Sequence, residues 1–275
     1  MPRIPDTGVG VSLFTREDIP EFLALAGAEG WISGAWEIEF LLRAFPSGCL
    51  VCRRQGTPVA FVTSVKYERS GWIGNLIVRQ DMRGMGLGYS LFRGALQALL
   101  KAGAQTVWLA ASGPGRPLYD RLGFLALDTI VRWEGRCCPG SDLPPSGPED
   151  ICALDSLGWG DRRSSLLDEV RKRGTLSALL GGFLVCQRWD GALQLGPWAA
   201  ADLKIAAALL GRAVVPAEDG FLTFLDVPEG NGAVSYLLRS HGFLPTSSTT
   251  LMYLGDAPAY VPGRIYALAS MGSMG

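Results

Sequence analysis

Three alternating glycines lie between a short apolar run and the start of a predicted helix. The apolar run covers residues 76–78, the glycines lie within residues 83–88, and the helix is predicted to begin at about Leu87. Glycine lets the backbone turn its N–H groups inward, and a helix N-terminus adds a partial positive charge. This order of strand, glycine loop and helix therefore predicts a binding site for a phosphorylated ligand.

The residues after the loop exclude the two commonest phosphate-binding motifs. A nucleotide P-loop requires Gly-Lys-Ser/Thr at the end of its glycines, and no Lys directly follows here. A dinucleotide fold requires G-x-G-x-x-G and an acidic residue about 20 residues later. This chain has G-x-G-x-G and no acidic residue between Asp81 and Asp120, so NAD is disfavoured. That interval carries uncompensated positive charge suited to a polyanion, at Arg83, Arg93, Lys101 and Arg116.

Two motifs in this region resemble those of the GCN5-related N-acetyltransferase (GNAT) superfamily. Arg83-x-x-Gly86-x-Gly88 resembles its acetyl-CoA motif, Q/R-x-x-G-x-G/A, and Tyr119-x-x-x-Gly123-Phe124 resembles its Y-x-x-x-G-F signature. A predicted helix and strand separate the two motifs, as in that family. The resemblance implies an α/β (α+β) fold, with a mixed and mostly antiparallel sheet flanked by helices. It also implies acetyl-CoA as co-substrate, without a metal.

The resemblance assigns roles to individual residues. Acetyl transfer from a thioester to an amine requires an oriented thioester, a donor to its carbonyl oxygen, a free amine and a proton for the leaving thiolate. The family implies that the Val78 N–H is this donor and that Tyr119 protonates, or hydrogen-bonds to, the leaving sulfur. The implied cofactor-binding residues are Leu76, Ile77, Val78, Arg83, Gly84, Met85, Gly86, Leu87, Gly88, Ser90 and Tyr119.

A general base does not follow from the sequence. The family often places a carboxylate near the strand before the loop, where this chain has Asn75, which cannot accept a proton. The alternative bases are Glu37, Glu39, Glu68, Asp226 and the single histidine, His241. Each of them is equally interpreted as a surface charge, a strand end or a turn residue. Tyr119 is alternatively a core aromatic residue, and the glycines alternatively form only a tight turn.

Length and local patterns predict the order of the elements. A chain of 275 residues predicts about two domains. Thr15 is the predicted N-cap of the first helix. Further helices are predicted at residues 35–44, 87–101 and 117–122, and strands at 49–54, 59–67, 72–78, 107–111 and 126–133. The Pro-, Gly- and Ser-rich residues 135–150 are typical of a linker. The predicted domains are an N-terminal GNAT domain at 1–136, a linker at 137–150 and a C-terminal domain at 151–275.

The second half repeats the first in outline. Residues 184–188 echo residues 50–54, and residues 242–243 echo the Gly-Phe pair at 123–124. Where the first half has Tyr119, the second has Leu238.

The glycine loop has no full counterpart in the second half. Only residues 196–200 stand in its place, before a helix predicted at 202–210. The C-terminal domain is therefore predicted to be a degenerate GNAT-like domain without a cofactor of its own. The whole chain resembles a tandem subgroup of the family.

Composition limits the partners and the location. A formal net charge of −1 argues against a nucleic-acid partner. No apolar run approaches the roughly 18 residues that span a bilayer, and the first residues lack a signal-peptide core, so a cytoplasmic protein without a membrane partner is expected. The six cysteines do not form a disulfide framework, and the pair Cys49 and Cys52 is expected to be buried thiols rather than metal or redox ligands. For Cys137 and Cys138, in the predicted linker, a reactive surface thiol stays open.

The acceptor is expected to be a primary amine of a small molecule or a peptide, and the sequence leaves a homodimer open. Tryptophans at 31, 36, 72, 159 and 198 either belong to the core or line an acceptor site for an amphipathic amine. Two other functions are compatible with the same motifs: a sensor or scaffold that binds acyl-CoA without turnover, and a transferase of a longer acyl group.

Overall fold

The computed structural model describes residues 9–140 and 150–275, which form two compact units. The first unit contains residues 9–66, 70–107 and 272–274. The second contains residues 67–69, 108–140, 150–271 and 275.

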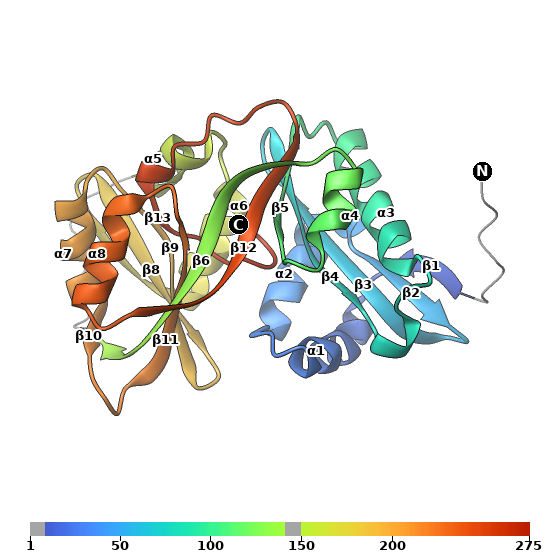
Figure 1. Cartoon of the computed structure of the whole chain (residues 1–275), viewed down its shortest axis with the longest axis horizontal. Helices are drawn as coiled ribbons and strands as arrows, with labels where there is room; N and C mark the ends of the chain where they lie inside the picture. The colour runs from blue at the N-terminus through green and yellow to red at the C-terminus, as the bar shows by residue number, and fades with distance from the viewer. Residues whose placement is uncertain (1–8, 141–149) are drawn as a thin grey trace. The chain divides into compact units, whose positions relative to one another are not determined.

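The first unit is a set of antiparallel strands with helices packed on it (Figure 1). Its strands are β1 (Val9–Leu13), β2 (Leu50–Arg54), β3 (Thr57–Lys66) and β4 (Ser70–Val78), each paired with the next. Its helices are α1 (Ile19–Ala28), α2 (Ala35–Ala44) and α3 (Leu87–Lys101), with 3₁₀ turns at Arg16–Asp18, Pro46–Gly48 and Gln80–Met82. Strand β5 (Thr106–Ala111) begins in this unit and ends in the second.

Helix α1 is preceded by the predicted cap at Thr15. The Thr15 N–H and hydroxyl both donate to the Asp18 carboxylate, at 3.0 and 3.1 Å. Arg53 Nη2 donates to the same carboxylate at 2.7 Å. These bonds satisfy the carboxylate, which is almost fully buried. The cap therefore opens a 3₁₀ turn, and the α-helix starts only at Ile19.

Helix α3 packs through its predicted apolar face onto β3 and β4. Leu91, Ala95 and Leu99 on this face are completely buried. A Cβ at Gly71 of β4 would lie only 2.6 Å from a Leu99 methyl group, so the strand and the helix meet there without an intervening side chain. This packing fixes the position of the glycine loop at the end of β4.

Strand β4 contains a bulge just before the glycine loop. Phe61 of β3 pairs with Ile77, whereas Thr63 pairs with Gly74, so β4 has one more residue than β3 in this interval. Asn75 lies in the bulge with a φ of +53°, a conformation that Asn tolerates better than most residues. Its amide Nδ2 donates to Thr63 Oγ1 at 3.0 Å and holds this conformation. A bulge bends the strand locally and re-aims the residues that follow.

The second unit contains a larger set of strands. Its elements are α4 (Arg116–Arg121), β6 (Leu125–Pro139), α5 (Ile151–Trp159), α6 (Ser164–Arg173), β7 (Gly174–Leu179), β8 (Gly182–Trp189), β9 (Ala192–Ala200), α7 (Leu203–Ala213), β10 (Val214–Pro216), β11 (Phe221–Pro228), α8 (Gly232–Ser240), β12 (Leu244–Gly255) and β13 (Ile265–Ala267), with a 3₁₀ turn at Pro262–Arg264. Strands β7, β8 and β9 pair antiparallel, and β11 pairs parallel with β9. The long strands β6 and β12 run side by side and antiparallel (Figure 1).

The predicted repeat is confirmed by the order of the elements. The series α5, α6, β7, β8, β9, α7 follows the same order as α1, α2, β2, β3, β4, α3, and β11, α8, β12 then follow as β5, α4, β6 do. Strand β9 even contains a bulge at the place of the β4 bulge, because Leu184 pairs with Trp198 and Cys186 pairs with Leu195. Both halves of the chain therefore have the same mixed α/β architecture, with a mostly antiparallel sheet flanked by helices.

One of the two sequence echoes was wrong. Residues 184–188 lie in β8, which pairs with the strand before α7 and therefore corresponds to β3 rather than β2. Short buried apolar runs resemble one another whatever their position in a sheet. The Gly-Phe echo is confirmed, because Phe124 N–H bonds to the Tyr119 carbonyl at 3.1 Å and Phe243 N–H bonds to the Leu238 carbonyl at 3.0 Å.

The predicted linker begins inside a strand. Strand β6 continues to Pro139, six residues beyond the predicted end at residue 133, since β10 and β11 pair with it. Pairing with neighbouring strands overrides the weak strand propensity of this Gly- and Pro-containing stretch. Residues 141–149 lie outside the described residues, and the domain boundaries at 136 and 150 stay predictions. Strand β1 was not predicted.

Candidate active site

The three glycines of the loop have two different roles. Gly84 and Gly86 both have a φ of +79°, which side chains disfavour, and no atom lies within 4 Å of a Cβ built on either residue. Gly88 lies inside α3 with an ordinary φ, and its added Cβ would touch Val78 at 3.4 Å. Gly84 and Gly86 therefore shape the turn and leave open space beside it. Gly88 lies against the side chains of β4.

The backbone N–H groups at the start of α3 have no partner within the described residues. None of the N–H groups from residue 84 to residue 89 donates a hydrogen bond, and the first to do so is that of Ser90, to the Gly86 carbonyl at 3.0 Å. Met85 is largely exposed, and Ser90 is half-buried in the first turns of the helix. Unpaired N–H groups at the positive end of a 15-residue helix form an anion-binding site.

Strand β4 directs the Val78 N–H away from β3. The next N–H, that of Arg79, donates to the Val59 carbonyl of β3 at 2.9 Å. Successive N–H groups of an extended strand point to opposite sides, so the Val78 N–H points to the other side of β4. Ile77 is buried, whereas Leu76 and Val78 are half-buried. The Val78 N–H thus points to the side of β4 opposite β3, as the predicted contact with the thioester carbonyl requires.

The Arg83 side chain holds the loop to the protein. Its Nε donates to the Val78 carbonyl at 3.0 Å, and its Nη2 forms an ion pair with Glu29 just after α1. The sequence-based expectation of uncompensated charge was therefore wrong at Arg83, and Arg116 also pairs with Asp120, at 3.6 Å. No local pattern indicates the Glu29 contact, because 54 residues separate the partners. The Arg83 N–H is also bonded, to the Gln80 carbonyl at 3.3 Å, so the prediction that it binds the pyrophosphate was wrong. Arg83 therefore contributes through the shape of the loop.

Tyr119 lies in α4 and belongs to the second unit, whereas the other predicted site residues belong to the first. It is 9% exposed, and its ring packs edge-on against Phe124 at 6.2 Å between centroids. Burial raises the pKa of the Tyr119 hydroxyl to about 12. The hydroxyl is therefore protonated at neutral pH, and burial makes it a weaker acid than an exposed tyrosine.

The five alternative bases are all either bonded within the protein or exposed. Asp226 is completely buried in a two-pronged ion pair with Arg132, at 2.8 and 2.9 Å. The His241 ring contacts the Leu237 carbonyl at 2.9 Å, and Glu68 is an exposed residue of the second unit.

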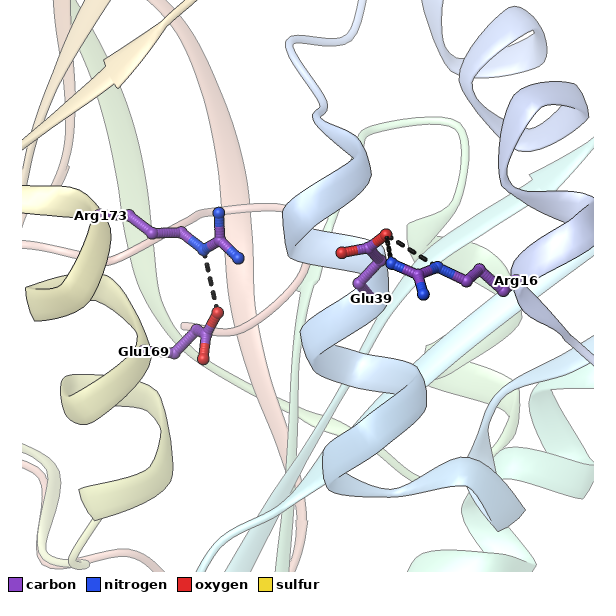
Figure 2. A network of polar contacts seen from close by, with 4 residues as sticks. All are labelled: Arg16, Glu39, Glu169 and Arg173. Carbon is purple, nitrogen blue, oxygen red and sulfur yellow. Dashed lines mark hydrogen bonds and ion pairs between the residues drawn. The ribbon is translucent and has the colours of Figure 1, made fainter.

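Glu39 is paired with Arg16 of the turn before α1. Figure 2 shows the Arg16 guanidinium in contact with Glu39, with a distance of 3.0 Å from Nε to the carboxylate. The same figure shows a second pair within α6, where Arg173 donates to Glu169 at 2.9 Å. Glu37, the fifth alternative, is 2% exposed and accepts a hydrogen bond from the Ser273 hydroxyl. Nothing in the local sequence joins Glu37 to a residue more than two hundred positions away.

The tryptophans and cysteines are mainly core residues. Trp72, Trp159 and Trp198 are buried, whereas Trp31 is 40% exposed and Trp36 is half-buried. The thiols of Cys49 and Cys52 are buried as expected, and burial raises the pKa of Cys49 to about 12. The described residues contain no cluster of three or more metal-ligating side chains. No helix in the described part of the chain is long and apolar enough to cross a membrane.

The equivalent place in the second half has a different chemistry. Helix α7 begins after Asp202, whose carboxylate accepts a hydrogen bond from the Ile205 N–H at 2.9 Å. The Ala201 N–H is also bonded, to the Gly181 carbonyl at 2.8 Å. The positive end of α7 is therefore already occupied by a negative charge of the protein. Together with Leu238 in the place of Tyr119, this supports the prediction that the second half has no cofactor site.

Two family profiles match the chain. Residues 15–124 match the Acetyltransferase (GNAT) family, and residues 151–267 match an Acetyltransferase (GNAT) domain. The chain is also 28% identical to an uncharacterized N-acetyltransferase from Methanocaldococcus jannaschii, over 43% of this chain and 62% of that protein. This chain thus spans less than two thirds of the length of that relative.

Solved structures share the fold. A candidate acetyltransferase from Pyrococcus horikoshii matches with a TM-score of 0.83 and 22% identity, over 99% of this chain and 98% of that one. A GCN5-related N-acetyltransferase from Sphaerobacter thermophilus matches with a TM-score of 0.60 and 17% identity, over 96% and 100% of the two chains. With both halves matched by GNAT profiles, the chain belongs to the GNAT acetyltransferase family, as a protein with two such domains in tandem.

Proposed function

We propose that the chain is an N-acetyltransferase that uses acetyl-CoA to acetylate a primary amine, through the glycine loop of its first domain. The observation that carries this proposal is the start of α3, where successive N–H groups lack partners among the described residues, beside two glycines with a φ of +79°. A pyrophosphate needs such a set of donors, and the family has acetyl-CoA as its acyl donor.

The residues present fit acetyl-CoA. The N–H groups of the loop, from Gly84 to Gly88, and the Ser90 hydroxyl would hold the pyrophosphate, whereas the Arg83 N–H is already bonded to the Gln80 carbonyl at 3.3 Å. The backbone of residues 76–78 would hold the pantetheine. Acetyl-CoA supplies an acyl group on a good leaving group, a thiolate.

The reaction that this arrangement supports is direct attack of the amine on the thioester. The Val78 N–H donates to the carbonyl oxygen, where negative charge develops as the C–N bond forms. The C–S bond then breaks, and the Tyr119 hydroxyl gives its proton to the departing sulfur. The acylated nitrogen releases its extra proton to solvent water, and the tyrosinate takes a proton back from solvent, which restores the enzyme. The acceptor is a primary amine of a small molecule or a peptide.

The test is a calorimetric titration of acetyl-CoA, with CoA, NAD and ATP as comparators, on the wild type and on Gly86→Glu. We expect micromolar binding of acetyl-CoA but not of NAD or ATP, and loss of this binding when a carboxylate lies at the start of α3. Gly103→Glu is the matched control, since Gly103 follows the same helix with a φ of +80° and open space around it. An absence of acetyl-CoA binding by the wild type would contradict the proposal.

The same titrations separate the alternatives. A sensor or scaffold would bind acetyl-CoA without releasing CoA in the presence of a panel of amines. A transferase of longer acyl groups would prefer the longer thioester in direct competition. A cytoplasmic location and a homodimer remain predictions, to be checked by fractionation and by sedimentation.

A further inference from the structure

Residues 272–274 lie against the bulge of β4, within the first unit. The Asn75 N–H donates to the Gly272 carbonyl at 3.0 Å. A Cβ at Gly74 would lie 2.7 Å from the Ser273 Cα and closer still to the Gly272 carbonyl oxygen. Because Gly74 has no side chain, the backbone of residues 272–274 can lie directly on β4. This contact is three residues before Ile77 in the strand.

The segment of residues 272–274 also brings a hydroxyl group to a buried carboxylate. The Ser273 hydroxyl donates to Glu37 of α2, and the two residues are 1% and 2% exposed. A buried carboxylate requires hydrogen-bond donors, and a positively charged donor stabilises it more than a neutral hydroxyl does. A primary ammonium at the position of the Ser273 hydroxyl would therefore be the better partner for Glu37.

The second half shows the same arrangement without the carboxylate. Residues 265–269 lie on the bulge of β9. A Cβ added to Gly196 in this bulge would lie only 3.0 Å from the Leu268 carbonyl carbon, so the two backbones are in close contact. Neutral amides hold this segment, because Gln187 and Gln194 donate to the Ala269 carbonyl at 3.0 and 2.9 Å. Strand β13 adds ladder pairs with β9. The described contacts of this segment are therefore with neutral groups in the second half, whereas in the first half the segment contacts a carboxylate.

We propose that Glu37 binds the ammonium of the acceptor. Residues 272–274 then occupy the acceptor's place on the bulge of β4, as an internal substitute for it. The acceptor is then an extended, peptide-like chain. Its carbonyl takes the Asn75 N–H, and its amine replaces the Ser273 hydroxyl. This inference rests on the proposed acetyl transfer, and Glu37 acts in it as a specificity-determining residue.

The test compares two peptides that differ in one group. Both have the sequence of residues 272–274, with an acetylated N-terminus and an amidated C-terminus. One contains serine, and the other contains 2,3-diaminopropionate, in which an ammonium replaces the hydroxyl. Binding is measured by calorimetry in the presence of CoA for the wild type, Ser273→Asp, Ser273→Ala, Glu37→Gln and Glu39→Gln.

Ser273→Asp places a second carboxylate beside Glu37 and should expel residues 272–274. We expect it to bind the diaminopropionate peptide at least about 10-fold more tightly than the wild type does, with Ser273→Ala intermediate. Glu37→Gln should lose the preference for the ammonium peptide over the serine peptide, whereas Glu39→Gln should keep it. Mass spectrometry should detect acetylation of the ammonium peptide when acetyl-CoA replaces CoA.

Equal affinity of Ser273→Asp for the two peptides would overturn the inference, as would a preference that survives Glu37→Gln. If Ser273→Asp fails to fold, judged by circular dichroism, the Ser273→Ala and Glu37→Gln measurements decide alone. A failure of the proposed function has a different signature, because acetyl-CoA would then not bind the wild type at all. All variants are expected to keep wild-type affinity for acetyl-CoA.

Discussion

Helices α3 and α7 begin at equivalent places in the two halves of the chain, yet in the part of the chain that the structure describes only α7 has a carboxylate of the protein bonded to its first turn. Helix α3 begins at a glycine with N–H groups that have no partner within the described residues. Helix α7 begins at Asp202, whose carboxylate already binds a backbone N–H. The same architecture therefore carries two different helix starts, and the residues of a single turn make the difference.

The largest expected effect on acetyl-CoA binding comes from placing an aspartate at the N-cap of α3, as Asp202 is placed at the N-cap of α7. Gly86→Asp places a carboxylate among the N–H groups proposed to hold the pyrophosphate, and Gly86→Asn places a neutral group of the same shape there. We expect the aspartate to weaken acetyl-CoA binding by more than about 100-fold, or about 2.7 kcal/mol, and the asparagine by much less. Calorimetry at low and high salt measures the difference, which should shrink as salt screens the charge. Equal losses would mean that the site does not discriminate by charge.

A smaller effect is expected where the halves differ between Tyr119 and Leu238. Tyr119→Phe should lower kcat by about 30-fold and leave acetyl-CoA affinity unchanged, since a thiolate is a good leaving group that needs only modest acid assistance. Leu238→Tyr is the control and should not alter the rate. Steady-state kinetics at saturating acetyl-CoA makes the comparison, and an unchanged kcat in Tyr119→Phe would leave Tyr119 a core aromatic residue.

The same tyrosine predicts a pH dependence. Burial raises the pKa of Tyr119 in the folded protein to about 12, above the ordinary value of 10.0. The folded state therefore holds its proton more strongly than the unfolded state. The contribution of this group to stability is complete below pH 10 and is lost as the pH rises from about 10 to about 12. Denaturation across this pH range should show a shallower loss in Tyr119→Phe than in the wild type.

Removing the cap of α7 should affect stability alone. Asp202→Ala leaves the Ile205 N–H without its acceptor and should lower the free energy of unfolding by about 1 kcal/mol. Urea denaturation measures this change. Acetyl-CoA should still bind at one equivalent per chain, because the second half also lacks the glycines of the loop. A second equivalent in Asp202→Ala would show that the carboxylate alone blocks a latent site.

The smallest effect is expected at the third glycine. Gly88→Ala adds a methyl group at ordinary contact distance, 3.4 Å from Val78, within a helix. Acetyl-CoA affinity should change by less than about 3-fold. Gly84→Ala, at a φ of +79°, should instead lower the free energy of unfolding by about 1 kcal/mol. Equal effects at the two positions would contradict the separate roles of these glycines.

Local sequence patterns predicted the parts of the site that are contiguous in the chain. The loop, the start of α3 at Leu87 and the Gly-Phe turn all depend on short motifs in which the backbone dictates the residue. The limits of α2 at residues 35 and 44 were also predicted, because the cap and the breaker are local.

Features that depend on partners far apart in the chain could not be predicted from the sequence. The ion pair of Arg83 with Glu29, the bulge at Asn75 and the contact of Glu37 with Ser273 all join segments that no local pattern relates. Strand β6 was predicted too short for the same reason, since its last residues are strand only through their pairing with β10 and β11.

Strand β6 ends the first repeat, yet its neighbours β11 and β12 both come from the second. A chain whose two repeats exchange strands in this way cannot be divided at the junction between them. A fragment that stops after Pro139 would carry a 15-residue strand without either neighbour, and such an open edge favours aggregation over a folded monomer. The first repeat therefore depends on the second whatever the chemistry of the second, because the second supplies both neighbours of β6.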